Sequence, residues 1–327
     1  MSLKLALIGY GNVGRALARL LRQKQHDFPF TITGIHTLRH GTAVCAGGLP
    51  EEPVFGPRMA TIEEFLYESW ADVAVELTTL EPATGEPATS HIRAAMARHM
   101  HVVTANKGPI AHAYASLREE AGRASVAFRF ESAVMDGAPV FNLWQHNLPG
   151  VKVLGFTGVL NSTSKVVIET MEQGGSFDEG LAAARGMGIT EADGAFDVEG
   201  WDSAAKTAAL ANVLMDARTT PLEVSTRGIT RLTPERMQEM ARSGKTVRLV
   251  SRGKRNGSRV SLRVRAEVLE RNDLLACTPG TSNLILFHTD LMGTFGTVSI
   301  EPGVEQTAYG VFSDLVEIMR IGSRTSA

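Results

Sequence analysis

Short apolar runs and amphipathic segments alternate along about the first 140 residues of the chain. Apolar runs rich in β-branched residues predict buried strands at 3–8, 30–38, 72–78, 101–106 and 126–134. Apolar residues at helical spacing between these runs predict helices at 12–23, 61–69, 90–99 and 113–123, the third of them capped by Ser90. Strands that alternate with helices in this way are typical of a parallel, doubly wound α/β sheet.

The pattern changes after about residue 140, where strands and helices no longer alternate regularly. We expect further strands at 151–160, 246–252, 259–269 and 283–287, with turn signals at Asn256-Gly257 and Pro279-Gly280. We expect helices at 162–173, 178–185, 201–215 and 306–320. The chain is therefore expected to form a doubly wound α/β domain over 1–135, completed by the C-terminal helix within 303–327, and an α+β domain over 136–302.

Composition narrows the class of partner. The 327 residues carry 33 basic and 35 acidic side chains, a formal net charge of −2, so neither nucleic acid nor a membrane surface is an expected partner. A small molecule is the expected partner instead. Cys45 and Cys277 are far apart and have no metal-ligand spacing, which suits a reducing compartment. The N-terminus does not resemble a signal peptide, and no apolar run is long enough for a membrane helix, so we expect a cytoplasmic protein.

A glycine-rich turn separates the first predicted strand from the first predicted helix. Its sequence, Gly9-Tyr10-Gly11-Asn12-Val13-Gly14, is the G-x-G-x-x-G fingerprint of Rossmann dinucleotide-binding domains. The backbone at this turn, including Asn12 and Val13, can approach a pyrophosphate at the helix N-terminus. We expect Thr78 and Thr79, which follow another strand of the sheet, to contact the same cofactor. The alternative is a purely structural glycine turn.

The end of the second predicted strand bears on the choice of cofactor. A dinucleotide without a 2′-phosphate usually meets an acidic residue there, but residues 34–40 contain none. Arg39 could pair with a 2′-phosphate, which favours NADP over NAD. The alternative is that Arg39 and His40 only solvate a loop.

Carboxylates and one lysine are concentrated between residues 188 and 210. Asp202 and Lys206 are one helical turn apart, a spacing that is common for solvated surface pairs. The helix around them is rich in alanine and leucine, which indicates burial instead. Asp193 and Asp197 are expected to orient the loop through local side-chain-to-backbone hydrogen bonds rather than to act in catalysis.

Five segments, in order, resemble the homoserine dehydrogenase family. They are TANK (104–107), ESAVMDGAP (131–139), GVLNST (158–163), the stretch 188–210 and PGVEQTA (302–308). The resemblance implies NAD(P)-dependent hydride transfer that interconverts L-homoserine and L-aspartate 4-semialdehyde, in threonine and methionine biosynthesis. It also implies a Rossmann domain followed by an α+β catalytic and dimerisation domain, in a short form of the family without the C-terminal regulatory domain.

The resemblance also implies roles for individual residues. Glu191 matches the residue that binds the substrate ammonium, and Thr163 is expected to bind the substrate beside free helix N–H groups. Asp202 matches the residue that contacts the reacting hydroxyl, and Lys206 matches the proton donor. Lys107, expected at the carboxyl end of the sheet near the cofactor, is a second catalytic lysine, and the division of labour between the two lysines stays open.

Two more features follow from the resemblance. The segment 131–138 matches a monovalent-cation site, with Glu131, Val134, Asp136 and Ala138 as the expected ligands of an ion such as sodium. The alternative is that Glu131 only accepts hydrogen bonds from neighbouring loop N–H groups. Gly303 matches a glycine turn that folds back onto the cofactor. A homodimer is implied, with residues 131–144 and part of the α+β domain at its interface.

Some positions depart from the family pattern, and other functions compete with the leading one. Ser162 stands where glycine is usual, Gly194 where proline is usual, and Ser164-Lys165 replaces a more typical polar pair. These changes could reshape the substrate site. The competing functions are another Rossmann dehydrogenase that acts on an amino acid or a semialdehyde, and a non-catalytic NADP-sensing protein.

Overall fold

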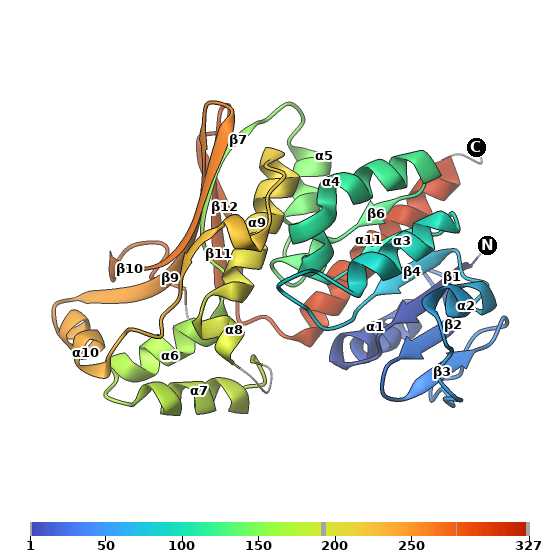
Figure 1. Ribbon diagram of the computed structural model, residues 1–327, viewed down its shortest axis with the longest axis horizontal. Coiled ribbons are helices and arrows are strands. Elements are labelled where there is room, and N and C mark those ends of the chain that lie inside the picture. The colour runs from blue at the N-terminus through green and yellow to red at the C-terminus, as the bar shows by residue number, and fades with distance from the viewer. Residues whose placement is uncertain (1, 191–193, 279, 325–327) are drawn as a thin grey trace. The chain divides into compact units, whose positions relative to one another are not determined.

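The computed structural model describes residues 2–190, 194–278 and 280–324 (Figure 1). The chain divides into two compact units. Unit 1 comprises Met1–Phe141 and Gly303–Ala327, and unit 2 comprises Asn142–Pro302. Unit 1 thus extends six residues past position 135, where we expected the first domain to end.

Unit 1 contains a six-stranded sheet in the order β3-β2-β1-β4-β5-β6. All neighbouring strands are parallel except β2 and β3, which are antiparallel. This arrangement confirms the doubly wound sheet, and the edge strand β3 is an element that the sequence pattern did not predict. The strands are β1 Leu3–Ile8, β2 Phe30–Thr37, β3 Gly41–Val44, β4 Val73–Glu76, β5 His101–Thr104 and β6 Phe128–Arg129.

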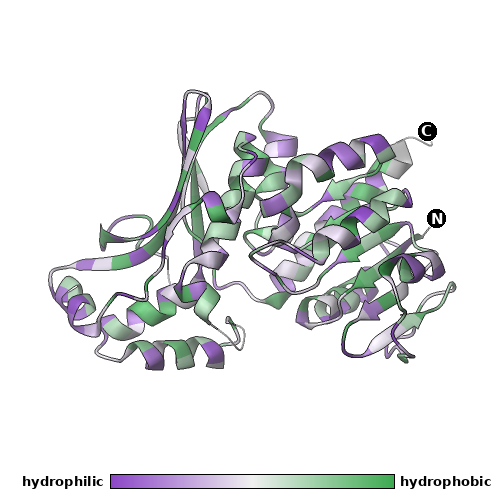
Figure 2. Ribbon diagram, in the orientation of Figure 1, coloured by the Kyte–Doolittle hydropathy of each residue, from purple (hydrophilic) through white to green (hydrophobic). Residues whose placement is uncertain are grey.

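Helices cover both faces of this sheet. Neighbouring residues of a strand point to opposite faces, and in β1 both sets are apolar, so each face is buried against helices. Leu5 and Leu7 of β1 belong to one buried cluster with residues of α1 and α11. Ala6 and Ile8 belong to the other, with residues of α2, α3 and α4. The strands between the two helical layers are largely hydrophobic (Figure 2). The helices are α1 Asn12–Gln23, α2 Ile62–Glu68, α3 Ala88–Ala97, α4 Lys107–Ala124 and α11 Val304–Arg324.

Unit 2 is the expected α+β domain. Its six-stranded sheet has the order β12-β11-β7-β9-β10-β8, and only the pair β10 and β8 is parallel. The strands are β7 Val153–Val159, β8 Ser225–Arg227, β9 Lys245–Asn256, β10 Arg259–Glu270, β11 Asn283–Thr289 and β12 Thr294–Ser299. The helices are α6 Ser162–Glu172, α7 Phe177–Gly186, α8 Ala195–Val198, α9 Trp201–Met215 and α10 Pro234–Arg242, while α5, Phe141–Asn147, begins at the last residue before the division.

Three local predictions were wrong. Helix α3 begins at Ala88, so Ser90 does not cap it; the Ser90 N–H instead donates to Glu86 Oε2 at 2.9 Å. The strand expected at 126–134 is only Phe128–Arg129, because a 3₁₀ turn, Glu131–Ala133, follows it. Helix α4 begins at Lys107 instead of position 113, because Asn106 caps it, accepting from the Gly108 N–H at 2.9 Å.

The described helices give no candidate for a membrane span. Within residues 2–190, 194–278 and 280–324, none of them is both long and apolar enough to cross a bilayer.

Candidate active site

Two of the three fingerprint glycines in unit 1 are required by close packing within the protein, and the third faces open space. Gly9 has φ +99°, and a Cβ there would lie 2.7 Å from the Leu77 carbonyl oxygen. A Cβ on Gly14 would lie 3.0 Å from the Gly9 carbonyl oxygen. A Cβ on Gly11 would meet no atom within 4 Å, so packing within the protein does not require that glycine. The open space beside Gly11, at the N-terminus of α1, fits a phosphate group that approaches the backbone.

A cavity of about 660 Å³ opens at this turn. Gly9, Gly11, Thr78, Thr79 and Arg39 all line it, so the structure brings these expected cofactor residues together. The complete lining is Ile8, Gly9, Tyr10, Gly11, His36, Thr37, Leu38, Arg39, His40, Arg58, Leu77, Thr78, Thr79, Pro87 and His91. The volume and the mixed polar and apolar lining are typical of small-molecule sites.

Basic side chains gather where the cavity passes the end of β2. Arg39, His40 and Arg58 all line this part. Burial lowers the pKa of His36 below its usual range, and the charges of His91 and Arg58 lower it further. Arg58 was not among the cofactor residues expected from the sequence. Its loop reaches the cavity because Gly56 pairs with Thr42 of β3, the strand that the hydrophobic pattern did not predict.

Lys107 lies at the carboxyl end of the same sheet. It is the first residue of α4, directly after the cap residue Asn106. The Asn106 side chain donates to the carbonyl oxygens of Thr78 at 3.1 Å and Thr79 at 3.4 Å, and so ties the ends of β4 and β5 together. Lys107 therefore begins its helix at the same edge of the sheet as Thr78 and Thr79.

In unit 2, Asn161 joins two carboxylates. It follows β7 and caps α6, accepting from the Ser164 N–H through Oδ1 at 2.8 Å. Its Nδ2 donates to Asp197 Oδ1 at 2.6 Å and to Asp202 Oδ2 at 3.1 Å. Because Asn161 is only 3% exposed, both carboxylates are held from inside the protein. Asn161 belongs to the GVLNST motif, but no role was expected for it from the sequence.

Lys206 completes this cluster. Its Nζ lies 3.0 Å from Asp202 Oδ2 and donates to the Leu160 carbonyl oxygen at 2.6 Å. The side chains of Lys206 and Asp202 are 15% and 14% exposed. The pair is therefore not the solvated helix-surface pair of the alternative interpretation, in which both side chains would lie in water.

Asp197 is a carboxyl of the cluster whose pKa is raised. Burial raises its pKa, and the neighbouring charge of Asp202 raises it further, while hydrogen bonds from Asn161 and Thr190 act in the opposite direction. Thr190 Oγ1 donates to Asp197 Oδ2 at 3.0 Å. Asp197 thus connects the turn at Asn161 with the loop that contains Thr190, through bonds between side chains instead of the local side-chain-to-backbone bonds that we expected.

The remaining expected substrate residues lie around this loop. Thr163, in the first turn of α6, is 1% exposed, and its hydroxyl donates to the Ile189 carbonyl oxygen at 3.3 Å. Glu191, the expected partner of a substrate ammonium, lies outside the described residues, as does Asp193. Thr190 and Gly194, which flank residues 191–193, are within the described part.

The segment expected to bind a cation contains one strongly held carboxylate. Glu131 is 3% exposed, and its Oε1 accepts the N–H groups of Val140 and of Phe141, the latter at 3.0 Å. Asp136 has φ +56°, and its Oδ1 accepts from the Thr307 hydroxyl at 3.3 Å. Across the described residues, no group of three or more His, Cys, Asp or Glu side chains could hold a metal. Any cation here would depend on backbone carbonyls, such as those expected from Val134 and Ala138.

Gly303 opens the final helix, α11. Its N–H donates to Gln306 Oε1 at 2.8 Å, which closes the turn before Val304.

Known protein families match the sequence of both units. A family model described as homoserine dehydrogenase matches residues 139–316, and one described as the NAD binding domain of homoserine dehydrogenase matches residues 9–131. The NAD(+)-dependent homoserine dehydrogenase of Pseudomonas canavaninivorans is 35% identical, over 98% of this chain and 97% of that protein. The homoserine dehydrogenase of Methanocaldococcus jannaschii is 33% identical, over 95% of this chain and 97% of that protein.

Solved structures agree with these matches. A homoserine dehydrogenase from Thiobacillus denitrificans has a TM-score of 0.84 at 26% identity, covering 99% of this chain and 74% of that one. A mutant of a hyperthermophilic archaeal homoserine dehydrogenase, in complex with NADPH, has a TM-score of 0.81 at 25% identity and covers 98% of both chains.

Proposed function

Because the chain belongs to the homoserine dehydrogenase family, we propose that it interconverts L-homoserine and L-aspartate 4-semialdehyde with a nicotinamide cofactor. The observation that carries this proposal is the partly buried, hydrogen-bonded cluster of Asn161, Asp197, Asp202 and Lys206. Burying charges is costly, so a protein keeps such a cluster where it orders the loops or acts on a ligand. The nicotinamide, when bound, supplies or accepts the hydride.

Lys206 is the proposed acid for reduction of the aldehyde. A lysine is an ammonium at neutral pH and can protonate the oxygen that gains charge during reduction. Asp202, 3.0 Å away, stabilises that ammonium, and the Leu160 carbonyl fixes its position. Asn161 fixes Asp202 in turn. Asp202 is also proposed to contact the substrate hydroxyl, and Lys107 is the second proposed catalytic lysine.

The amino-acid end of the substrate needs groups of both signs. The Ser164 N–H in the first turn of α6 is taken by the Asn161 cap, so the N–H groups of Ser162 and Thr163 are the ones proposed to bind the substrate carboxylate. Glu191 is proposed to bind the substrate ammonium. The substrate would then lie between the start of α6 and the loop near Thr190.

For the cofactor, we propose a preference for NADP over NAD. The support is the group of basic side chains beside the end of β2, where Arg39 and Arg58 line one cavity and no acid follows the strand. The names of relatives point both ways, since one is called NAD(+)-dependent and another was solved with NADPH. The residues of this chain therefore carry the proposal.

The test of the function is a steady-state assay. Oxidation of NADPH and of NADH is followed with L-aspartate 4-semialdehyde, and the reverse reaction with L-homoserine. We expect wild-type turnover, and a kcat about 10²–10⁴-fold lower in Lys206→Met, which removes the proposed acid but keeps an unbranched side chain. Absence of wild-type turnover with both cofactors would overturn the proposed function. Near-normal kcat in Lys206→Met would remove that lysine from the mechanism.

We further propose, from the resemblance, a monovalent cation at 131–138 and a homodimer. A carboxylate can accept about four hydrogen bonds or ligands, so Glu131 could serve a cation while it accepts two N–H groups. Replacing sodium and potassium with tetramethylammonium should then lower the activity. The homodimer, with residues 131–144 and part of the α+β domain at its interface, is proposed from the resemblance.

A further inference from the structure

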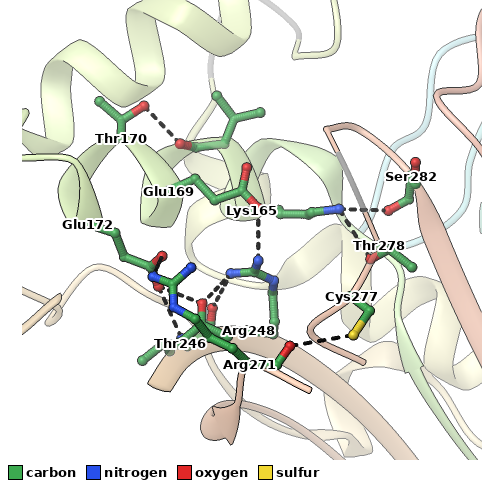
Figure 3. A network of polar contacts seen from close by, with 12 residues as sticks. Lys165, Glu169, Thr170, Glu172, Thr246, Arg248, Arg271, Cys277, Thr278 and Ser282 are labelled. Atoms are coloured by element: carbon green, nitrogen blue, oxygen red, sulfur yellow. Dashed lines mark hydrogen bonds and ion pairs between the residues drawn. The ribbon is translucent and has the colours of Figure 1, made fainter. Parts of the chain in front are cut away.

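A buried lysine that the proposed mechanism does not use lies in the first turn of α6. Lys165 is 1% exposed. Its Nζ donates to Thr278 Oγ1 at 3.2 Å and to the Ser282 carbonyl oxygen at 3.3 Å (Figure 3). A cation at this place is doubly unfavourable, because it is removed from water and because the helix N-terminus is itself partially positive. Such a residue needs a compensating role.

The partners of Lys165 belong to the segment between β10 and β11, here called the 278–282 segment, of which Thr278 and residues 280–282 are described. A second bond from the same helical turn reaches it, since Ser162 Oγ donates to the Thr281 carbonyl oxygen at 2.6 Å. The other side of the segment is also held, because Ser282 Oγ accepts the Glu301 N–H at 3.0 Å. The segment is thus attached to the first turn of α6 by two side chains of that turn.

The far half of α6 is fixed by different contacts. Glu169 lies 2.8 Å from Arg248 Nη2 on β9, and Glu172 accepts from Thr246 Oγ1 at 2.5 Å (Figure 3). Arg271 Nη2 lies 3.4 Å from Glu172. None of these contacts reaches the substrate end of the helix. Within the network of Figure 3, Lys165 alone joins α6 to the 278–282 segment.

Lys165 is close in sequence to the groups that the proposed function assigns to the substrate. Thr163 is two residues before it and Asn161 four, in the same turn. A shift of this turn would move its N–H groups and Thr163, which the proposed function assigns to the substrate carboxylate. Displacements of this kind affect binding even when the moved residue is several ångströms from the chemistry.

We propose that Lys165 is a positioning residue for the substrate: it holds the 278–282 segment against the first turn of α6 and so fixes the N–H groups and Thr163 that bind the substrate carboxylate. The proposal rests on the proposed function, because it takes L-homoserine or the semialdehyde as the ligand of that turn. Lys165 would therefore contribute to the affinity for the substrate, whereas Lys206 would contribute to proton transfer.

The test compares Lys165→Met with wild type and with Arg271→Met. The methionine fills the same space without the ammonium, and Arg271→Met removes a cation that contacts the other end of α6. We expect Lys165→Met to raise KM for L-homoserine about tenfold, as for the loss of a charge-assisted hydrogen bond. The kcat should change by less than about threefold. Arg271→Met should leave KM unchanged, and cofactor affinity should be unchanged in both variants.

If Lys165→Met does not fold, two less disruptive variants test the same attachment. Thr278→Val and Ser162→Ala each remove one hydroxyl of the attachment, and each should raise KM about two- to threefold, with a larger than multiplicative rise in the double variant. An unchanged KM in folded Lys165→Met, or in both milder variants, would overturn the proposal while wild-type turnover leaves the proposed function intact. A loss confined to kcat would overturn it as well. Absence of wild-type turnover would instead refute the proposed function, and this proposal with it.

Discussion

Raising the pH from 7 to about 10.5 should stabilise the wild-type protein relative to Lys165→Met. Burial lowers the pKa of Lys165 from the usual 10.5 to about 8, and the charge of Arg248 on β9 lowers it too, while Glu169 on α6 and Glu301 after β12 act in the opposite direction. The folded protein therefore binds fewer protons at Lys165 than the unfolded chain does between these two pH values. By linkage, the free energy of unfolding rises with pH across this interval.

The magnitude follows from the size of the pKa change. Below pH 8 the lysine is charged in both states, and the folded state carries the full cost of burying that charge. Above pH 10.5 it is neutral in both, and the cost is gone. A difference of this size corresponds to roughly 3 kcal/mol. Because Lys165 is 1% exposed, solvent screening should not reduce this value greatly.

Urea denaturation at several pH values measures the effect. Tryptophan fluorescence is a suitable signal, since Trp144 and Trp201 lie in unit 2 and only Trp70 in unit 1. The difference between wild type and Lys165→Met cancels the other groups that titrate between pH 8 and 10.5. Arg271→Met is the matched control, because an arginine stays charged over this range and its difference from wild type should be constant. A wild-type to Lys165→Met difference that does not change with pH would refute the reasoning.

Three further predictions concern the cofactor, the substrate and the assembly. Arg39→Ala should weaken NADP(H) binding more than NAD(H) binding, and isothermal titration of both cofactors would contradict the 2′-phosphate assignment if the ratio of their Kd values stayed the same. Glu191→Gln should raise KM for L-homoserine with little change in kcat, because the ammonium is bound throughout the reaction; steady-state kinetics would reject that role if only kcat fell. The protein should sediment as a dimer at micromolar concentration, and a monomer would exclude the proposed interface.

The hydrophobic pattern predicted the elements that have a long, regular period. Strand β1 and helices α1 and α9 have the bounds that the sequence indicated. The wrong predictions arise where hydrogen bonds from a side chain end or start an element, which a hydrophobic pattern does not reveal. The strand expected at 126–134 stops at Arg129, and the chain turns at Glu131, whose buried carboxylate accepts two N–H groups nine and ten residues further on.

The residues of the candidate site likewise fall into two groups, those that the sequence indicated and those that only the structure shows. Motifs and the family resemblance pointed to the fingerprint glycines, Arg39, Asp202 and Lys206 as candidates, because each depends on residues close in sequence. Asn161 and Arg58 were missed, because their importance comes from contacts across the fold. Asn161 meets Asp202 at a separation of 41 residues, and Lys165 meets Ser282 at 117. Spacing within one sequence carries no signal for such pairs.

The composition of α9 explains how the charged pair of Asp202 and Lys206 can be largely withdrawn from water. Ala204, Ala205, Ala208 and Ala209 are completely buried, and the helix packs on β9 and β10 through this small-residue surface. Short side chains let a helix backbone approach a sheet closely. The Lys206 side chain can then reach the Leu160 carbonyl, at the end of β7, without leaving the protein interior. The alanines that made the stretch look like core therefore also bring the lysine to the turn where we place the substrate.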